Sequence, residues 1–545
     1  MRILEVITLS GNVKIYRRII LKMTKLPKET KAQRVERIKK EKDGLEVIND
    51  IYVYAVLGTD VDPEDIDRFK WYGLYSQNKN LQDENDLTLY FMLRIKLEQG
   101  QLNIEQLEAI ESISSDFARG TATFTTRQDL QFHFIKVRDL PEIFKRLDMV
   151  GLSTMFAAGD VPRNAVSCPV NGIDHDQVCD VRPIVEKVNK FLGGNKNFSN
   201  LPRKFKVGIS GCNKHCMNHE IQDISFNAVQ VSPTKILFDV HVGGGLASNK
   251  RIATHLGYVT SSQVLNVVKA VVKIFRDHGD RSSRTKARVG HIVEKWGVEK
   301  FLEVLHEELN FKLKEPNIIE YTPYAQRGHF GIHESTVKAK SYIGCAISGG
   351  RIKNEGIKNL VCILKKYKAT TIKLTTTQNM VILDAPTKNA EEMSQDLIDV
   401  GIDTKPSTFK ARTLSCTGLN FCKFAISETK ELSDKIINHL EEKFPNFDEI
   451  VSMSINGCPN SCSHPHIVDI GLLGCKLKHE GQSVNGFELI VGGNLEGSKS
   501  QFGMKTGLKF IPQDAPQVIE NLINEYKSSN NKSFQSFLGQ KANEK

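Results

Sequence analysis

Long apolar runs are missing from this chain of 545 residues. A membrane-spanning helix needs about twenty consecutive apolar residues, so none is expected here. The first 22 residues also lack the continuous apolar core and small-residue cleavage site of a secretory signal. A more ordinary pattern begins at Met23, which leaves the true start open between Met1 and Met23. We expect a cytoplasmic protein without membrane contact.

Signatures of several binding classes are absent as well. No G-x-G-x-x-G follows a predicted strand, so nothing indicates a flavin or nicotinamide domain. Helix-turn-helix patterns, aromatic RNA-binding stripes and zinc knuckles are also lacking, and we expect no nucleic-acid binding. The net charge of +10 equally suits an acidic protein partner or an anionic substrate.

The overall composition is typical of a multidomain globular protein. Hydrophobic residues make up 40% of the chain and charged residues 25%, and the length predicts about two to four domains. Eleven cysteines in so long a chain do not resemble a disulfide scaffold. Several of them stand in short-spaced groups, which indicates metal or cluster binding in a reducing compartment.

One pattern of strands and helices occurs twice. Apolar residues alternate along 87–97, which predicts a strand, and helical spacing follows with Asn103 as its cap. The order of strand, glycine turn, helix, strand and T-T-x-Q turn recurs at 340–383. Gly100 matches Gly350 and Gln128 matches Gln378, each 250 residues apart.

The repeat continues beyond these small units. RNAVSC at 163–168 recurs as RTLSC at 412–416, and SGCNKHC at 210–216 recurs as NGCPNSC at 456–462. Matches in the same order over so long a stretch predict two homologous halves. Each half is a small αβ unit followed by a larger α/β unit.

Cysteine usage differs between the halves. Cys416 and Cys422 form one close pair and Cys458 and Cys462 another, which gives the four thiolates that a [4Fe-4S] cluster needs. The alternative is a zinc ion assisted by neighbouring histidines, although tetrahedral zinc sites favour tighter C-x-x-C knuckles.

The first half carries a different set of thiols. Cys168, Cys179, Cys212 and Cys216 could hold a second cluster, or they could be inert thiols left by the duplication. Both alternatives stay open at this point. The remaining cysteines, Cys345, Cys362 and Cys475, are predicted to be ordinary core thiols.

These residues resemble a known family. CTGLNFC at 416–422 with NGCPNSC at 456–462 resembles the C-x5-C…C-x3-C signature of the siroheme-dependent sulfite and nitrite reductases. The likeness extends in the same order to TTRQDLQFH, DVPRNAVSCPVNG, LPRKFK and VGGN, and covers the chain from about residue 50 onward. The resemblance implies an α+β and α/β fold with two ferredoxin-like repeats paired into one domain and two larger siroheme- and cluster-binding domains. The expected bounds are 1–50 for a basic extension, 51–155 and 316–400 for the small repeats, and 156–315 and 401–545 for the large halves.

The resemblance also implies roles for individual residues. Arg94, Arg163, Lys204 and Lys206 are expected to form an anion pocket over a siroheme. Arg127, Arg203 and Asn494 would contact the siroheme, whose many carboxylates need cationic partners. Cys416, Cys422, Cys458 and Cys462 would hold the [4Fe-4S] cluster, with Cys462 bridging to the siroheme iron.

The implied reaction is a six-electron reduction of sulfite to sulfide, with ferredoxin as electron donor and the chain acting as a monomer. The alternative is reduction of nitrite to ammonia. Lys206 favours sulfite, because nitrite reductases of the family often carry Asn at that position. A more distant alternative is a zinc- or cluster-containing binding protein without reductase activity.

Overall fold

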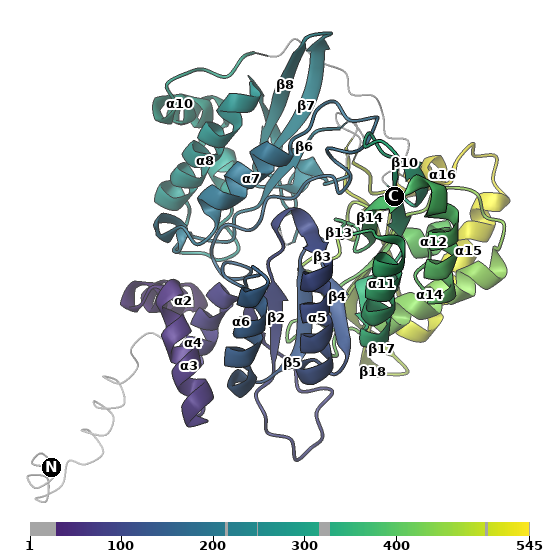
Figure 1. The fold of residues 1–545 in the computed structure, drawn as a ribbon, viewed down its shortest axis with the longest axis horizontal. Helices are drawn as coiled ribbons and strands as arrows, with labels where there is room; N and C mark the ends of the chain where they lie inside the picture. The colour runs from purple at the N-terminus through teal and green to yellow at the C-terminus, as the bar shows by residue number, and fades with distance from the viewer. Residues whose placement is uncertain (1–28, 213–215, 248, 316–327, 496–499, 544–545) are drawn as a thin grey trace, which may run out of the picture.

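Figure 1 shows the computed structural model of this protein, which describes residues 29–212, 216–247, 249–315, 328–495 and 500–543. The two possible starts, Met1 and Met23, lie outside these ranges. Within them, no helix has the length and apolar character needed to cross a membrane. The duplicated α/β fold predicted from the sequence is confirmed, whereas the exact domain bounds stay predictions.

The two small repeats form antiparallel sheets that exchange one short strand each. The sheet orders are β1-β2-β5-β4-β12 and β10-β11-β14-β13-β3. The first repeat contributes β1 (Leu74–Ser76), β2 (Phe91–Ile95), β3 (Gln101–Asn103), β4 (Thr121–Phe124) and β5 (Leu130–Ile135). The second contributes β10 (Gly331–Glu334), β11 (Lys340–Cys345), β12 (Arg351–Lys353), β13 (Thr371–Leu374) and β14 (Met380–Pro386). Because β3 pairs with β13 and β12 pairs with β4, the repeats form one domain.

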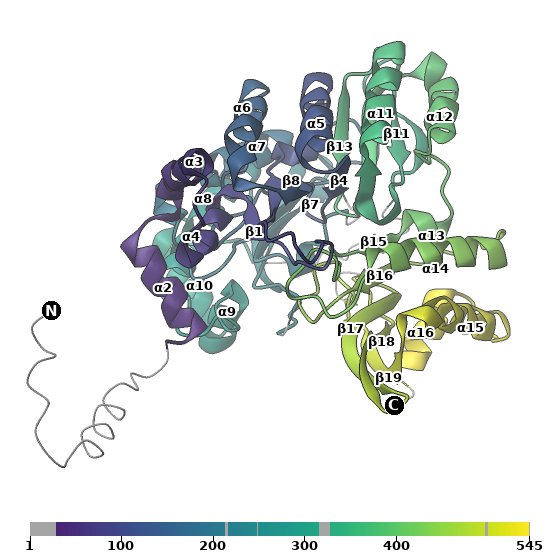
Figure 2. The same cartoon turned by 90° about the horizontal axis from the view of Figure 1, so that it is seen from below.

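Four helices pack on these two sheets. They are α5 (Ile104–Phe117), α6 (Leu140–Met149), α11 (Asn354–Tyr367) and α12 (Ala390–Asp399). Figures 1 and 2 show α5 and α11 side by side, and their apolar residues join those of both sheets in one continuous core. The α5 helix begins as predicted, with Asn103 and Gln106 forming a reciprocal capping box.

The strand predicted over 87–97 is shorter than the alternation suggests. It occupies Phe91–Ile95, and Leu87 is 81% exposed. The preceding segment is held in a turn, because Asp86 accepts a hydrogen bond from the backbone N–H of Thr88 and Gln82 donates to the Asp86 carbonyl. A local turn therefore overrides the alternating pattern before β2.

Each large half has its own mixed sheet backed by helices (Figure 2). The first sheet contains β6 (Val207–Ser210), β7 (Ile224–Ser232), β8 (Lys235–Val242) and β9 (Thr254–Val259), with α7 (Arg182–Leu192), α8 (Val264–His278), α9 (Val289–Trp296) and α10 (Val298–Glu308). The second contains β15 (Thr413–Ser415), β16 (Met453–Asn456), β17 (Ile470–His479), β18 (Gln482–Val491) and β19 (Met504–Phe510), with α13 (Thr408–Ala411), α14 (Lys430–Lys443), α15 (Ala515–Lys527) and α16 (Phe534–Asn543). The pair β6–β7 of the first sheet and the pairs β15–β16 and β16–β17 of the second run parallel, and the other strand pairs of these two sheets are antiparallel.

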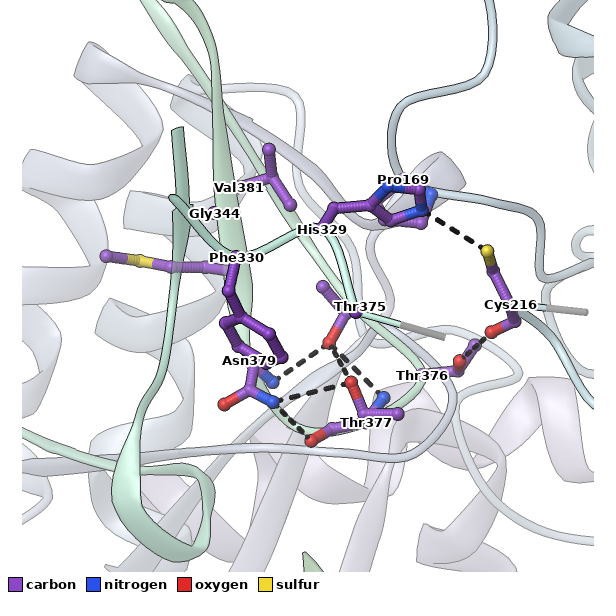
Figure 3. Close-up of a pocket in the computed structure, with 12 residues that line it drawn as sticks. Pro169, Cys216, His329, Phe330, Gly344, Thr375, Thr376, Thr377, Asn379 and Val381 are labelled. Carbon is purple, nitrogen blue, oxygen red and sulfur yellow. Dashed lines mark hydrogen bonds between the residues drawn. The ribbon is translucent and has the colours of Figure 1, made fainter. Parts of the chain in front are cut away.

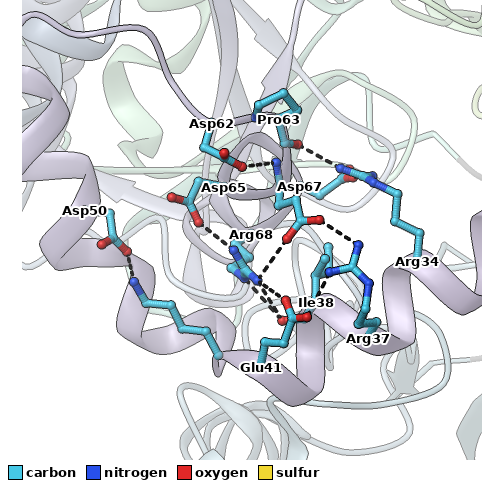
Figure 4. A network of polar contacts seen from close by, with 12 residues as sticks. Arg34, Arg37, Ile38, Glu41, Asp50, Asp62, Pro63, Asp65, Asp67 and Arg68 are labelled. Carbon is cyan, nitrogen blue, oxygen red and sulfur yellow. Dashed lines mark hydrogen bonds and ion pairs between the residues drawn. The ribbon is translucent and has the colours of Figure 1, made fainter. Parts of the chain in front are cut away.

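The described part of the chain before β1 is helical. It contains α2 (Lys31–Glu41), α3 (Val47–Leu57) and α4 (Pro63–Arg68), joined by the ion-pair network in Figure 4. Arg34 pairs with Asp67, and Arg68 pairs with Asp65 at 2.8 Å. The buried Lys39 of α2 donates to the Leu201 carbonyl at 3.0 Å, so this part of the chain reaches the first large half.

Two equivalent glutamines link the repeats to each other and to the large halves. The Gln128 amide donates to the Leu374 carbonyl at 2.9 Å and accepts from the Ser167 N–H at 3.0 Å. The Gln378 amide donates to the Phe124 carbonyl at 3.0 Å and accepts from the Ser415 N–H at 3.0 Å. Both glutamines are buried and adopt left-handed backbone conformations, with φ of 59° and 61°.

Gly100 leaves the space that Gln128 occupies, which gives a stability prediction. Gly100 and Gly151 have nearly equal φ, 70° and 69°, but an added Cβ lies 2.7 Å from the Gln128 Cβ at Gly100 and meets nothing within 4 Å at Gly151. In both variants the alanine must adopt a left-handed backbone conformation, which costs free energy. Only the Gly100→Ala methyl group also collides with the Gln128 side chain. We expect Gly100→Ala to destabilise the protein by about 1–3 kcal/mol more than Gly151→Ala. Thermal unfolding of the two variants measures this difference, and equal melting temperatures would contradict it.

Candidate functional site

Two arginines of the first half converge beside a tyrosine. Arg94 of β2 and the buried Arg163 both donate to the Ala157 carbonyl, Arg94 at 3.1 Å. Burial alone would raise the pKa of the half-buried Tyr75, but the positive charges of Arg163, Arg94 and Lys204 outweigh burial and lower this pKa to about 7. The electrostatic potential at this point therefore favours a negative charge.

Lys204 and Lys206 add to the same positive region. They are alternate residues of the segment before β6, as the LPRKFK motif requires for side chains on one face. Burial and the charges of Arg203 and Arg288 lower the pKa of Lys204 to about 8. Burial and Lys204 lower the pKa of Lys206 as well. The two half-buried lysines thus repel each other.

Asp160 is a counter-charge at the edge of this region. Arg284 binds its two carboxylate oxygens at 2.8 Å each, Arg203 lies at 3.4 Å and Lys39 of α2 at 3.6 Å. Burial would raise the pKa of Asp160, but Arg284, Lys39 and Arg203 hold it well below its usual range. The ion pair with Asp160 therefore holds Arg203 in place, while 35% of the Arg203 side chain stays exposed to solvent.

Asp223 orients the lysine segment. Its carboxylate accepts two hydrogen bonds from Arg288, at 2.9 and 2.7 Å, and one from the backbone N–H of Lys206 at 2.8 Å. Sequence reasoning missed Arg284 and Arg288. The available signal was the run of arginines just before α9, in which Arg284 stands three residues after Arg281 and Arg288 four residues after Arg284.

Arg127 makes mostly protein contacts. Its guanidinium donates to the Gln222 side chain at 2.9 Å and to the Asn164 carbonyl at 2.6 Å, and burial lowers its pKa to about 10. Among the described residues, the Arg127 Nε has no hydrogen-bond partner. Its predicted pairing with cofactor carboxylates stays a prediction.

Four cysteines of the second half meet at one edge of a sheet. Cys416 follows β15 and Cys458 and Cys462 follow β16, and these two strands are parallel neighbours, so their carboxyl ends lie together. The Gly457 N–H donates to the Cys416 sulfur at 3.2 Å, which joins the two loops. The charge of Cys462 raises the pKa values of Cys416, Cys422 and Cys458, after a larger contribution from burial.

Cys462 is the cysteine that faces the cationic region. It is the exposed member of the four, and its charge acts on Lys204. The hydroxyl of Thr126, in the T-T-R-Q turn, donates to the Cys462 carbonyl at 3.4 Å. The four cysteine thiols of the second half and the positive region of the first half therefore form one site.

Asn494 lies in the segment after β18, whose neighbouring residues bond to the loop that follows Cys462. Its backbone exchanges hydrogen bonds with Gln501, at 3.0 and 2.8 Å. The preceding Gly493 packs so closely on the carbonyls of His466 and Val468 that a Cβ there would lie 2.6 Å from the His466 oxygen. The VGGN segment thus supports the loop that follows Cys462, while its predicted contact with a cofactor stays a prediction.

The thiols of the first half divide into two groups. Cys168 and Cys216 lie against the ring of His329, and Cys212 contacts both of these thiols. Cys179 is half-buried and its carbonyl accepts a hydrogen bond from Asn171. The prediction of a core position was wrong for Cys362, which is exposed on the outer face of α11.

The residues present fit an iron–sulfur cluster and an anionic tetrapyrrole. Four thiols from two neighbouring loops are the usual donor set of a [4Fe-4S] cluster, and a bound cluster would deprotonate them despite the raised pKa values. In the cationic region of the first half, the buried Nε groups of Arg127 and Arg163 lack partners within the described part of the chain. Such donors suit the carboxylates of a siroheme or the oxygens of its ligand.

Comparisons with known proteins agree with this site. The family model described as "Nitrite and sulphite reductase 4Fe-4S domain" matches residues 158–313 and 409–535. The model described as "Nitrite/Sulfite reductase ferredoxin-like half domain" matches residues 82–150 and 335–400. Each model thus matches twice, once in each half.

Individual relatives cover most of the chain. A protein named Sulfite reductase [ferredoxin] 1 from Mycolicibacterium paratuberculosis is 33% identical over 88% of this chain and 89% of its own length. Ferredoxin–nitrite reductase from Synechococcus elongatus is 29% identical over 91% of this chain and 96% of its own length. The solved structure of the Mycobacterium tuberculosis NirA protein superposes with a TM-score of 0.87 at 32% identity, covering 93% of this chain and 96% of that one. Together with the matched domains, these likenesses establish that the chain belongs to the nitrite and sulfite reductase family.

Proposed function

We propose that this protein reduces sulfite to sulfide with six electrons from ferredoxin, using a siroheme and a [4Fe-4S] cluster. The observation that carries the proposal is the exposed Cys462 thiol, which lies close enough to Lys204 for their charges to interact. Lys204 in turn acts on Tyr75 together with Arg94 and Arg163, and on Lys206. A sulfur ligand next to fixed positive charge is suited to delivering electrons to a bound oxyanion. The relatives named as ferredoxin-dependent sulfite reductases support this assignment.

The cationic residues would bind and orient the anion. Arginine keeps its charge at all relevant pH values and offers several donors in a fixed plane, which suits two oxygens of sulfite. Arg94 and Arg163 are held by the Ala157 carbonyl, so little reorganisation is needed when the anion enters. When bound, siroheme and cluster supply single electrons at one low-potential centre.

The lysines and Tyr75 would supply protons to the departing oxygens. Each oxygen leaves as water, which requires proton donors within reach of the bound anion. Lys204 and Lys206 carry protons on Nζ, and the Tyr75 hydroxyl lies close enough to Arg163 for the positive charge of that arginine to lower its pKa. The Asp223 contact with the Lys206 N–H would keep this segment in place during turnover.

Nitrite is the second candidate substrate. Relatives named as nitrite reductases match at 29% identity over the same length of chain. Nitrite is a smaller anion of lower charge, so it needs fewer cationic donors. The pair of lysines at 204 and 206 favours sulfite as the preferred substrate.

The electron donor would bind through charge. The net charge of +10 favours encounter with a small acidic ferredoxin. We further propose that the chain works as a monomer in the cytoplasm. Sedimentation of the purified holoenzyme tests the first point, and fractionation of the source cells tests the second.

The direct test is a spectrum with a metal count on anaerobically purified protein. We expect visible siroheme bands and about five irons per chain, one in the siroheme and the rest in the cluster. The same sample should form sulfide from sulfite with reduced ferredoxin. A protein without these bands, purified from cells that make siroheme, would overturn the proposed function.

Lys206→Asn tests the substrate preference. Removing one cationic donor should lower sulfite turnover at least about tenfold, because sulfite carries more charge and loses more oxygens. Nitrite turnover should fall far less. Steady-state rates with both anions measure the ratio, and Lys476→Asn, an exposed position on β17, is the matched control. Equal losses of turnover with both anions would show that Lys206 does not distinguish sulfite from nitrite.

Salt should separate donor docking from chemistry. Because encounter with an acidic ferredoxin depends on opposite charges, kcat/KM for ferredoxin should fall severalfold between low and physiological ionic strength. The rate with a small uncharged or cationic chemical reductant should change little. A ferredoxin rate that does not respond to salt would mean that the basic surface is not used for docking.

A further inference from the structure

Three side chains of the first half approach one another as closely as ligands of a single metal ion. The Cys168 sulfur lies 3.4 Å from Nε2 of His329 and the Cys216 sulfur lies 3.2 Å from the same nitrogen. All three ligand atoms are buried and lie within 4.8 Å of one another. Figure 3 shows His329 pointing at Cys216 beside a cavity of about 10 Å³.

These distances match a mononuclear tetrahedral site. Zinc bonds of ~2.3 Å to sulfur and ~2.0 Å to nitrogen place neighbouring sulfur and nitrogen ligands ~3.5 Å apart. A cubane cluster holds its thiolates farther apart, because four irons lie between them. Among the described residues, no other group of three His, Cys, Asp or Glu ligands is so compact, and this includes the four cysteines of the second half.

Cys212 offers a further sulfur close to two of these ligands, although that sulfur lies outside the set of ligand atoms that are all within 4.8 Å of one another. Its thiol contacts both Cys168 and Cys216, and the Ser210 hydroxyl lies 3.8 Å from its sulfur. The four donors would then be three sulfurs and one nitrogen, a common set for structural zinc. Cys179 is not needed.

Neighbouring groups support charged thiolates at this site. Zinc with three thiolates carries a net charge of −1, and the buried Lys373 lies close enough for its charge to act on Cys168. The second half has the same arrangement, because the buried Lys430 acts on Cys416. The Thr376 hydroxyl also donates to the Cys216 carbonyl, as Thr126 does to the Cys462 carbonyl.

We propose that Cys168, Cys212, Cys216 and His329 bind one structural zinc ion. Cys168, Cys212 and Cys216 match Cys416, Cys458 and Cys462 in the internal repeat, and His329 takes the place that Cys422 has in the cluster. The ion joins the first large half to the segment that leads into β10 of the second small repeat. Zinc is redox-inactive, so this site braces the domains without carrying electrons.

Metal analysis of the holoenzyme tests the proposal independently of the reaction. We expect about one zinc per chain in addition to about five irons. X-ray absorption at the zinc edge should show about three sulfurs at ~2.3 Å and one nitrogen at ~2.0 Å. About nine irons without zinc would mean a second cluster, and about five irons without zinc would mean packed free thiols. Zinc bound by oxygen and nitrogen alone would be adventitious, and each of these three results overturns the proposal.

Variants locate the ion. Cys216→Ser and His329→Gln should each lower the zinc content to below about a fifth of the wild-type value while iron stays unchanged. Cys362→Ser removes an exposed thiol away from the site and is the matched control. Full zinc retention in both site variants would contradict the assignment. If neither variant folds, the absorption spectrum of the unaltered protein still decides the ligand set.

Discussion

The paired glutamines Gln128 and Gln378 are the contact on which the rest of the structure depends. Each donates a hydrogen bond to the carbonyl that ends a strand of the other repeat. Each also accepts a hydrogen bond from a backbone N–H, that of Ser167 or Ser415, and these two serines directly precede Cys168 and Cys416. Loss of one amide would leave a buried carbonyl and a buried N–H without partners, at a cost of about 1–3 kcal/mol each. The same bonds therefore join the repeats and set the positions of Cys168 and Cys416. This explains why Gly100 and Gly350 are glycines, since a side chain there would displace the glutamine.

The positive region is built at an energetic cost that other parts of the fold offset. Burying a cation costs several kcal/mol unless it is paired. Asp160 and Asp223 lie behind the region and are already bound to Arg284 and Arg288, so they orient the cations without neutralising them. Lys39 of α2 also reaches Asp160, which makes the N-terminal helix part of the support. The surplus of positive charge beside Cys462 is then available to an anion and to carboxylates of a cofactor.

Local patterns in the sequence were sufficient for many elements and insufficient for contacts between distant segments. The Asn103 cap and the two T-T-x-Q turns could be predicted, because each rests on residues a few positions apart, whereas the cluster-binding role of the four cysteines of the second half stays a prediction. The exchange of β3 and β12 could not, since strands of three residues carry no information about their partner. His329 was missed for the same reason, because 113 residues separate it from Cys216. Arg284 and Arg288 reach the lysine segment only through the fold of the first half.

Duplication followed by divergence accounts for two metal-site chemistries in one chain. In the second half Cys416 follows β15, and Cys458 and Cys462 follow β16. In the first half Cys168 follows an isolated parallel bridge from Val166 to Gly208 of β6, and Cys212 and Cys216 follow β6. Equivalent glutamines hold the residue before the first cysteine in each half. In the second half Cys422 comes from the segment after Cys416, and no three of the four thiols, all among the described residues, lie within 4.8 Å of one another, as the proposed cluster ligands would. In the first half His329, from the segment before β10, lies 3.4 Å from the Cys168 sulfur and 3.2 Å from the Cys216 sulfur, a spacing suited to one ion. The two proposed sites therefore differ in their fourth ligand. Cys422, close in sequence to Cys416, would complete a cluster that carries electrons, whereas His329, distant in sequence, would complete a zinc site that only holds the surrounding domains together.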